Sequence, residues 1–229
     1  MILAIAAALA AAAPAAAPCP DVVTASALVC RALQAQSAGN SEAAAQAFEE
    51  AAKASPNDDP TTARLWAAAG NMWLTAKQPG KAAFALDNAL ASKHLEAEQR
   101  GEALLDRARA AEAQNDLKTA RARLNEAGAT ISNDPFYWYF SAALAIREGD
   151  KVGAQSAINK ALTLAPSDPT ILFEAGHVAF ESGDEDKARS YWMRAAGSDP
   201  NGAAGRAAAK AVEMLGVTPT VKSSAEPTK

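Results

Sequence analysis

Few side chains in this sequence could act as a nucleophile, a base or a metal ligand. The two histidines, His94 and His177, stand far apart, and no metal-ligand spacing surrounds either of them. The chain contains no glycine-rich phosphate loop, nucleophile elbow or paired-carboxylate motif. We interpret its Asp and Glu residues as helix caps and solvated helix faces. The sequence thus predicts a protein that is not an enzyme and that has no metal and no cofactor.

Cys19 and Cys30 are the only cysteines in the chain. An even number of cysteines in an exported protein favours a disulfide, which here would tie the N-terminal segment to the first helix. In the alternative interpretation, Cys30 is a small buried residue and forms no bond.

The chain opens with an apolar, alanine-rich stretch. Residues 1–17 have the apolar core and the small residues of a secretory signal peptide, and they are too few to span a bilayer. We expect cleavage between Ala10 and Ala17, followed by secretion across the inner membrane into the periplasm, with no membrane span in the mature protein. A lipoprotein anchored at Cys19 is the alternative, but Pro18 replaces the small residue that lipoprotein signals carry there.

Composition favours helices throughout the rest of the chain. The sequence is 49% hydrophobic and 21% charged, alanine dominates the hydrophobic fraction, and aromatic residues make up only 6%. The net charge is -4, and no window gathers basic residues into a stripe. We therefore predict an all-α protein that does not bind nucleic acid.

The sequence repeats itself with an offset of 34 residues. When the segment that starts at Pro135 is aligned with the one that starts at Pro169, the pairs that match are Asp134 with Asp168, Gly149 with Gly183, Asp150 with Asp184, Ala154 with Ala188, Ala161 with Ala195 and Pro166 with Pro200. Such a period is typical of an architecture in which one structural unit is stacked many times.

This period resembles the tetratricopeptide repeat (TPR), which has a large residue at position 4, small residues at positions 8 and 20, and proline at position 32. The best-matching repeat contains Leu172, Gly176, Ala188 and Pro200 at these positions. The resemblance covers five repeats, at 25–58, 63–96, 101–134, 135–168 and 169–202, with four-residue insertions at 59–62 and 97–100. It implies a right-handed α-solenoid of helix-turn-helix units.

Local signals delimit these units and the ends of the chain. An aspartate precedes a proline at Asp59, Asp134 and Asp168, where we expect helices to begin, and Asp150 and Asp184 follow glycines as expected for caps of the second helices. We predict a linker at 18–24, a capping helix at 203–216 and a disordered tail at 217–229.

In the family that the chain resembles, partners usually lie in a concave groove that the first helix of each repeat lines. Transferred by repeat position, the groove residues are Arg64, Asn71, Arg109, Phe136, Tyr139, Arg147, Phe173, His177 and Phe180. Four of them form a predicted aromatic cluster towards the C-terminal end, which suits a protein or peptide partner with apolar side chains. Alternatively, Phe136 and Phe180 pack inside, or the final helix covers them.

The resemblance implies a non-catalytic scaffold that mediates protein–protein or protein–peptide interaction through this groove in the bacterial periplasm. The clamp that holds chaperone C-termini is not present in its usual form, because Val29 and Leu33 stand where it needs Lys and Asn. One alternative is a structural or assembly subunit of an envelope complex, which uses its outer face or self-association. Another is an enzyme with an unfamiliar site at His177. The sequence predicts no oligomeric state.

Overall fold

The computed structural model describes residues 19–56 and 59–216. The predicted signal peptide at 1–17 and the predicted disordered tail at 217–229 therefore lie outside the described residues.

Eleven α-helices and no strand make up the described part of the chain, which confirms the predicted fold class. The helices are α1 (Ala25–Ser37), α2 (Ser41–Lys53), α3 (Pro60–Thr75), α4 (Pro79–Ala91), α5 (Ala97–Ala113), α6 (Leu117–Ile131), α7 (Pro135–Glu148), α8 (Lys151–Leu164), α9 (Pro169–Glu181), α10 (Glu185–Ser198) and α11 (Ala203–Gly216).

The helices are stacked in pairs along a curved path. Each odd-numbered helix packs on the even-numbered helix that follows it, and each even-numbered helix also packs on the next odd one. The odd-numbered helices also contact one another, α3 with α5, α5 with α7, α7 with α9 and α9 with α11. In the described part of the chain, the even-numbered helices make no comparable contacts with one another. The odd-numbered helices therefore lie on the inner, concave side.

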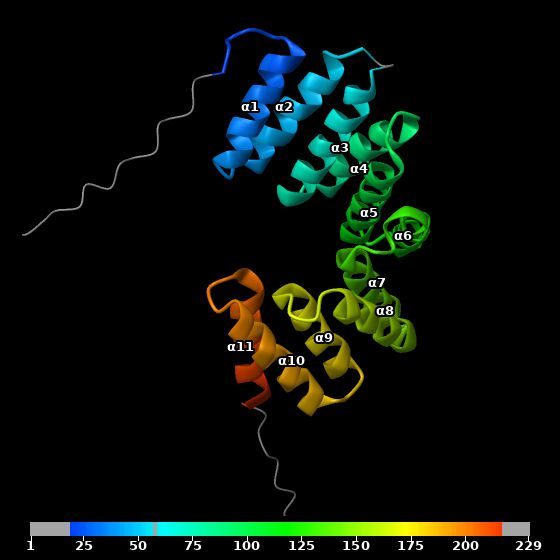
Figure 1. The fold of residues 1–229 in the computed structure, drawn as a ribbon, viewed down its shortest axis with the longest axis vertical. Helices are drawn as coiled ribbons and strands as arrows, with labels where there is room; N and C mark the ends of the chain where they lie inside the picture. The colour runs from blue at the N-terminus through cyan, green and yellow to red at the C-terminus, as the bar shows by residue number, and fades with distance from the viewer. Residues whose placement is uncertain (1–18, 57–58, 217–229) are drawn as a thin grey trace, which may run out of the picture.

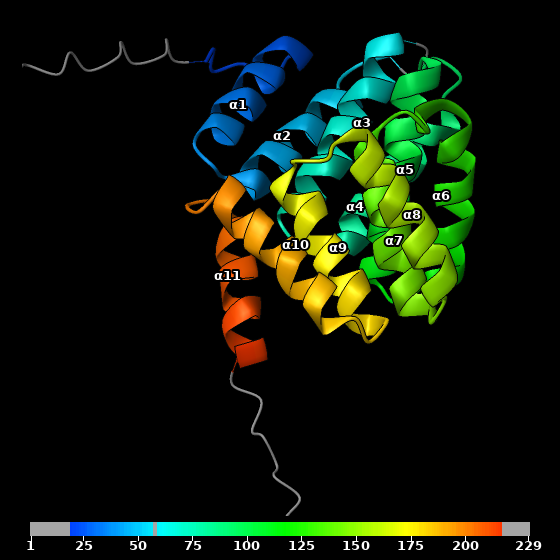
Figure 2. The same cartoon turned by 60° about the horizontal axis from the view of Figure 1, so that its bottom comes forward.

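The curvature is visible in both views of the fold. In Figure 1 the ribbon follows a C-shaped path on which α1 and α11 are the two ends. In Figure 2 these two helices again lie on the same side of the molecule, and α5 to α8 lie on the opposite side. Such a superhelix presents one continuous concave surface.

The expected aspartate caps are present and confirm the predicted helix starts. Asp59, Asp134 and Asp168 each accept a hydrogen bond from the backbone N–H two residues on, at 2.7, 2.8 and 2.9 Å, with proline at the first helical position. Asp150 and Asp184 cap the second helices of their pairs through the backbone N–H three residues on. Each cap satisfies an N–H group that the helix itself leaves without an acceptor.

The turn inside each pair has the same backbone conformation. A residue with positive φ ends the turn in all five pairs, and these residues are Gly39, Lys77, Asn115, Gly149 and Gly183. They occupy position 15 of the five predicted repeats. Asparagine at position 115 tolerates the left-handed conformation, but Lys77 adopts it against its preference, so the geometry of the stacked unit overrides that preference.

The two four-residue insertions lengthen the first helices of their pairs. α3 begins at Pro60 and α5 begins at Ala97, so residues 60–62 and 97–100 add a first turn to these helices. The two helices have 16 and 17 residues, whereas α7 and α9 have 14 and 13.

Small residues let the paired helices approach each other. A Cβ atom at Gly176 of α9 would lie 2.2 Å from Nε1 of Trp192, and one at Gly70 of α3 would lie 2.4 Å from Cγ of Leu86. Trp192 and Leu86 are buried and fill the space that these glycines leave. Alanine supplies most of the other buried positions, so the few large side chains carry much of the core.

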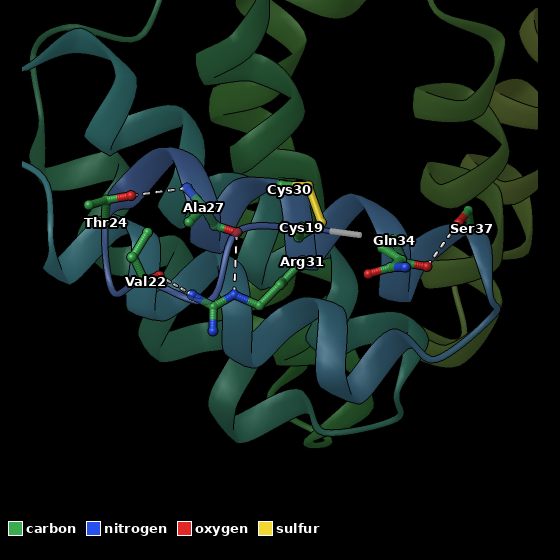
Figure 3. Close-up of a disulfide and its surroundings, with 8 residues drawn as sticks. All are labelled: Cys19, Val22, Thr24, Ala27, Cys30, Arg31, Gln34 and Ser37. Atoms are coloured by element: carbon green, nitrogen blue, oxygen red, sulfur yellow. Dashed lines mark hydrogen bonds between the residues drawn. A yellow bond between two sulfur atoms is a disulfide. The ribbon is translucent and has the colours of Figure 1, made fainter. Parts of the chain in front are cut away.

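A disulfide and a final helix close the two ends of the stack. Cys19 and Cys30 are bonded, with their Cα atoms 5.7 Å apart, and beside them Arg31 donates hydrogen bonds to the carbonyl oxygens of Val22 and Ala27 (Figure 3). At the other end, α11 buries Ala208 and Leu215 against α9 and α10, while its residues Arg206, Lys210 and Glu213 are exposed.

Candidate functional site

Three hollows follow the odd-numbered helices along the concave surface. The N-terminal hollow, of about 370 Å³, is lined by Phe48, Arg64, Ala68, Asn71, Glu102 and Asp106 among others. The central hollow, of about 580 Å³, includes Leu105, Arg109, Phe136, Tyr139, Ala143 and Thr170. The C-terminal hollow, of about 450 Å³, includes Glu174, His177, Phe180, Trp192, Met214 and Leu215.

The polar groove residues between α3 and α5 are held by one carboxylate. Asn71 donates from Nδ2 to Oδ2 of Asp106 at 2.8 Å, and Arg109 donates from Nη1 to Oδ1 of the same residue at 2.8 Å. Asp106 is largely buried at the side chain, so these bonds are shielded from water more than a surface pair is. Arg64 stays exposed and lines the N-terminal hollow.

Arg147 lies at the edge of the groove, where it joins two helices. Its Nη1 donates to the carbonyl oxygen of Glu112 at 3.0 Å and also to the carboxylate of that residue, and its Nη2 donates to Oδ1 of Asn115 at 2.9 Å. The guanidinium therefore fixes α7 against the C-terminal end of α5. This arginine positions the groove wall and has few donors left for a partner.

The central hollow presents an accessible aromatic pair. Phe136 is 45% exposed and lies edge-on to Tyr139, with ring centroids 6.3 Å apart. Burial raises the pKa of the Tyr139 hydroxyl, so this group stays protonated and can donate a hydrogen bond. The small side chain of Ala143 lies in the same hollow. This part of the groove can accept an apolar side chain beside a hydroxyl group.

The C-terminal hollow has a second set of rings. His177 lies 4.5 Å from Phe173 between ring centroids and is edge-on to Trp192 at 5.7 Å. Phe180, half-exposed, lies 5.9 Å from the Trp192 ring. The end of α11 contributes Met214 and Leu215 to the opposite wall. The final helix thus forms one side of this hollow and leaves Phe180 open to solvent.

The four aromatic residues that the repeat pattern grouped together do not form one cluster. Phe136 and Tyr139 lie in the central hollow, and Phe180 lies in the C-terminal hollow. Phe173 is half-buried, with its ring against that of His177 and its carbonyl oxygen accepting a hydrogen bond from Nε1 of Trp192. The groove therefore offers two separate apolar contacts, one in each hollow.

Glu174 is a functional candidate that the sequence interpretation missed. It is only 8% exposed, and it lines the C-terminal hollow without a hydrogen-bond partner among the described residues. Nδ1 of His177 lies 3.8 Å from Oε2 of Glu174, and Tyr139 of α7 also interacts with this carboxyl electrostatically. Burial raises the pKa of the Glu174 carboxyl to about 7 and lowers that of the His177 imidazole. The signal in the sequence was an acidic residue inside an apolar helix.

Neither metal nor membrane features accompany the groove. Within the described residues, no three His, Cys, Asp or Glu side chains gather as they would around a metal ion. No helix in residues 19–56 and 59–216 has the length and apolar character to cross a membrane.

Comparison with protein-family models finds no match, and comparison with curated protein sequences finds none either. Solved structures do match. PilW, a type IV pilus biogenesis factor, is 17% identical with a TM-score of 0.65, over 80% of this chain and 81% of that one. TTC0263, a TPR protein of Thermus thermophilus, is 18% identical with a TM-score of 0.64, over 83% and 100%.

YrrB, a TPR protein with an unusual peptide-binding site, is 19% identical with a TM-score of 0.55, over 81% of this chain and 92% of its own. At these identities the likeness concerns the fold. The stacked helix pairs, the glycine contacts at position 8 and the structural neighbours agree with one another. This chain has the fold of the tetratricopeptide-repeat proteins.

Proposed function

We propose that this chain is a non-catalytic scaffold that binds a protein or an extended peptide along its concave groove in the bacterial periplasm. The observation that carries the proposal is the accessible Phe136 ring, which stands beside Tyr139 in a hollow of about 580 Å³. Aromatic side chains in a concave surface are typical anchors for a partner, because burial of the ring adds much apolar contact area.

Two further observations support the mode of binding and the location. Asn71, Arg109 and Arg147 are already bonded within the protein, so the wall of the groove is organised before a partner arrives. The bond between Cys19 and Cys30 is of a kind that persists in oxidising compartments such as the periplasm. The proposed signal peptide at 1–17 supports the same location.

The outer face is the second candidate binding surface, as in an assembly subunit of an envelope complex. Phe84 of α4 is 56% exposed there, at a hollow of about 460 Å³ that also includes Trp73, Lys81 and Glu49. The groups of this hollow bind one another, since Trp73 donates to Glu49 at 3.1 Å and the Lys81 ammonium lies 4.2 Å from the centre of the Trp73 ring. The groove is proposed as the main site because Phe136 lies in the concave surface, whereas Phe84 lies on the outer face.

A matched pair of phenylalanine variants tests the proposal. We expect Phe136→Ala to weaken binding of a partner captured from envelope extract by roughly tenfold or more, because truncation of an anchor ring commonly costs over 1 kcal/mol. Phe84→Ala should change the affinity by less than about twofold, since that ring lies on the outer face. Affinities are measured with the purified, identified partner, after circular dichroism has shown that both variants retain their helicity.

The opposite pattern would contradict the proposal. If Phe84→Ala weakens binding and Phe136→Ala does not, the partner binds the outer face, and the assembly-subunit alternative replaces the groove.

A further inference from the structure

The C-terminal hollow combines apolar walls with carboxylates. Phe180 and Met214 supply exposed apolar surface beside the buried Trp192, and Glu174, Glu181 and Glu185 line the same hollow of about 450 Å³. We propose that this hollow binds a basic side chain of the partner, an arginine or a lysine, with the charged group on Glu174 and the aliphatic stem against the rings. This inference rests on the proposed function and adds a charge requirement to it.

The elements around Glu174 contribute no positive charge to the hollow. From α9 come Glu181 and His177, and the lowered pKa of His177 keeps its imidazole neutral at pH 7 and above. α10 contributes Glu185 and Trp192 to the hollow, whereas α7 and α11 contribute only uncharged residues, among them Ile146 and Ala211. Tyr139 of α7 also interacts electrostatically with Glu174, and its raised pKa keeps its hydroxyl neutral. No Lys or Arg of the described chain lines the hollow. A cation is therefore the ligand that its charge complements.

Glu174 itself lacks what a buried carboxylate needs. A charge removed from water is costly unless a hydrogen-bonded partner of opposite sign accompanies it. This carboxyl is 8% exposed, accepts no hydrogen bond from the described residues, and lies 3.8 Å from a neutral imidazole. An arginine from a partner would supply two parallel N–H donors, and a lysine would supply one ammonium group.

The walls suit the rest of a basic side chain. The exposed ring of Phe180 attracts a cation through its electron-rich face, and the methylene groups of arginine or lysine cover apolar surface such as Met214. Arginine, which has this double character, is enriched in protein interfaces.

Binding of a cation should release a proton. Because the pKa of Glu174 is about 7, the carboxyl is protonated in part of the molecules at neutral pH, and a bound cation stabilises the ionised form. Affinity for a basic side chain should therefore rise between pH 6 and pH 8, whereas affinity for a neutral side chain of the same shape should stay constant.

Two capped pentapeptides test the inference with the full chain. The probes are acetyl-Gly-Leu-Arg-Leu-Gly-amide and the same peptide with citrulline in place of arginine, which keeps the shape and removes the charge. Binding is followed by NMR through the indole N–H of Trp192. At pH 8 we expect the arginine peptide to bind at least fivefold more tightly than the citrulline peptide, with a smaller ratio at pH 6.

Substitutions assign the effect to one carboxyl. Glu174→Gln should make the two peptides bind equally, and Glu213→Gln, which removes an exposed charge of α11 outside the hollow, should leave the ratio unchanged. Equal binding of both peptides to the unmodified chain, or no binding of either, would overturn the inference. So would an arginine preference that survives Glu174→Gln.

The chain's own C-terminal residues are another source of cations. Lys222 and Lys229 follow α11 in the sequence. If the Lys222→Gln, Lys229→Gln double variant binds the arginine peptide at least tenfold more tightly than the unmodified chain, the chain's own segment is the occupant and the inference is wrong.

Capture of the partner through Phe136 tests the proposed function, and the two peptides test the charge requirement. If Phe136→Ala abolishes capture while the two peptides bind equally, only the charge requirement fails. If capture depends on Phe84 instead, the proposed function fails, whatever the peptides do.

Discussion

Leu144→Ala is expected to lower the free energy of unfolding by about 2 to 5 kcal/mol. Leu144 of α7 is fully buried in the cluster that joins α5, α6 and α7, where Ala108, Ala111 and Leu124 are its neighbours. Alanines have no side-chain length with which to fill the space that the leucine leaves, so a cavity should remain and the cost should lie towards the upper end. Urea denaturation followed by circular dichroism measures the loss.

The matched control is Leu164→Ala at the end of α8. Leu164 is 45% exposed, so the same truncation removes less buried surface and should cost less than about 1 kcal/mol. Equal losses in the two variants would contradict the packing described here. The dependence of the unfolding free energy on urea concentration gives a further test. If it falls in Leu144→Ala and not in Leu164→Ala, the two ends of the stack unfold separately, as repeat proteins can when a central unit is weakened.

The unmodified chain is expected to lose about 3 kcal/mol of unfolding free energy through Glu174 between pH 4.5 and pH 7, and Glu174→Gln should abolish this loss. Burial raises the pKa of this carboxyl to about 7 in the folded protein, compared with 4.5 in the unfolded chain. Between these values the folded protein keeps a proton that the unfolded chain has released. The stability that the proton on Glu174 contributes to the folded protein is therefore fully present below pH 4.5, and it is lost as the pH rises to 7.

Denaturant midpoints measured at pH 4.5, 6 and 8 test this pH dependence. Relative to the unmodified chain, Glu174→Gln should gain stability as the pH rises, because glutamine stays neutral throughout. Glu181→Gln, an exposed change in the same helix, controls for the loss of one negative charge. If the two variants respond to pH alike, the carboxyl of Glu174 is not isolated from water as the structure indicates.

The sequence allowed the fold to be predicted in detail because local and long-range signals agree. The aspartates at 134 and 168 cap helices as expected, and the glycine at 176 meets a tryptophan 16 positions later in the stacked partner helix. The insertions at 59–62 and 97–100 appear in the sequence as four extra residues between consecutive 34-residue repeats. Their helical conformation depends on packing along a longer first helix, which the repeat pattern does not contain.

The site was harder to predict, because repeat positions assign a face of a helix and do not assign contacts. Phe173 and Phe180 share the predicted face, but Phe180 is the more accessible of the two, since Phe173 is half-buried with its ring against His177. Arg147 occupies a groove position and binds Glu112 instead of solvent. Glu174 was missed because a glutamate on a helix is usually solvated, and its burial arises from α10 and α11 packing around it.

Site-specific photocrosslinking in cells tests the central claim, that the partner binds the concave groove, most directly. Benzoylphenylalanine replaces Phe136 in one sample and Phe84 in another, and both full-length chains are expressed and irradiated. We expect a covalent adduct with another protein from position 136 and none from position 84. An adduct from position 84 alone would place the partner on the outer face and contradict binding in the groove.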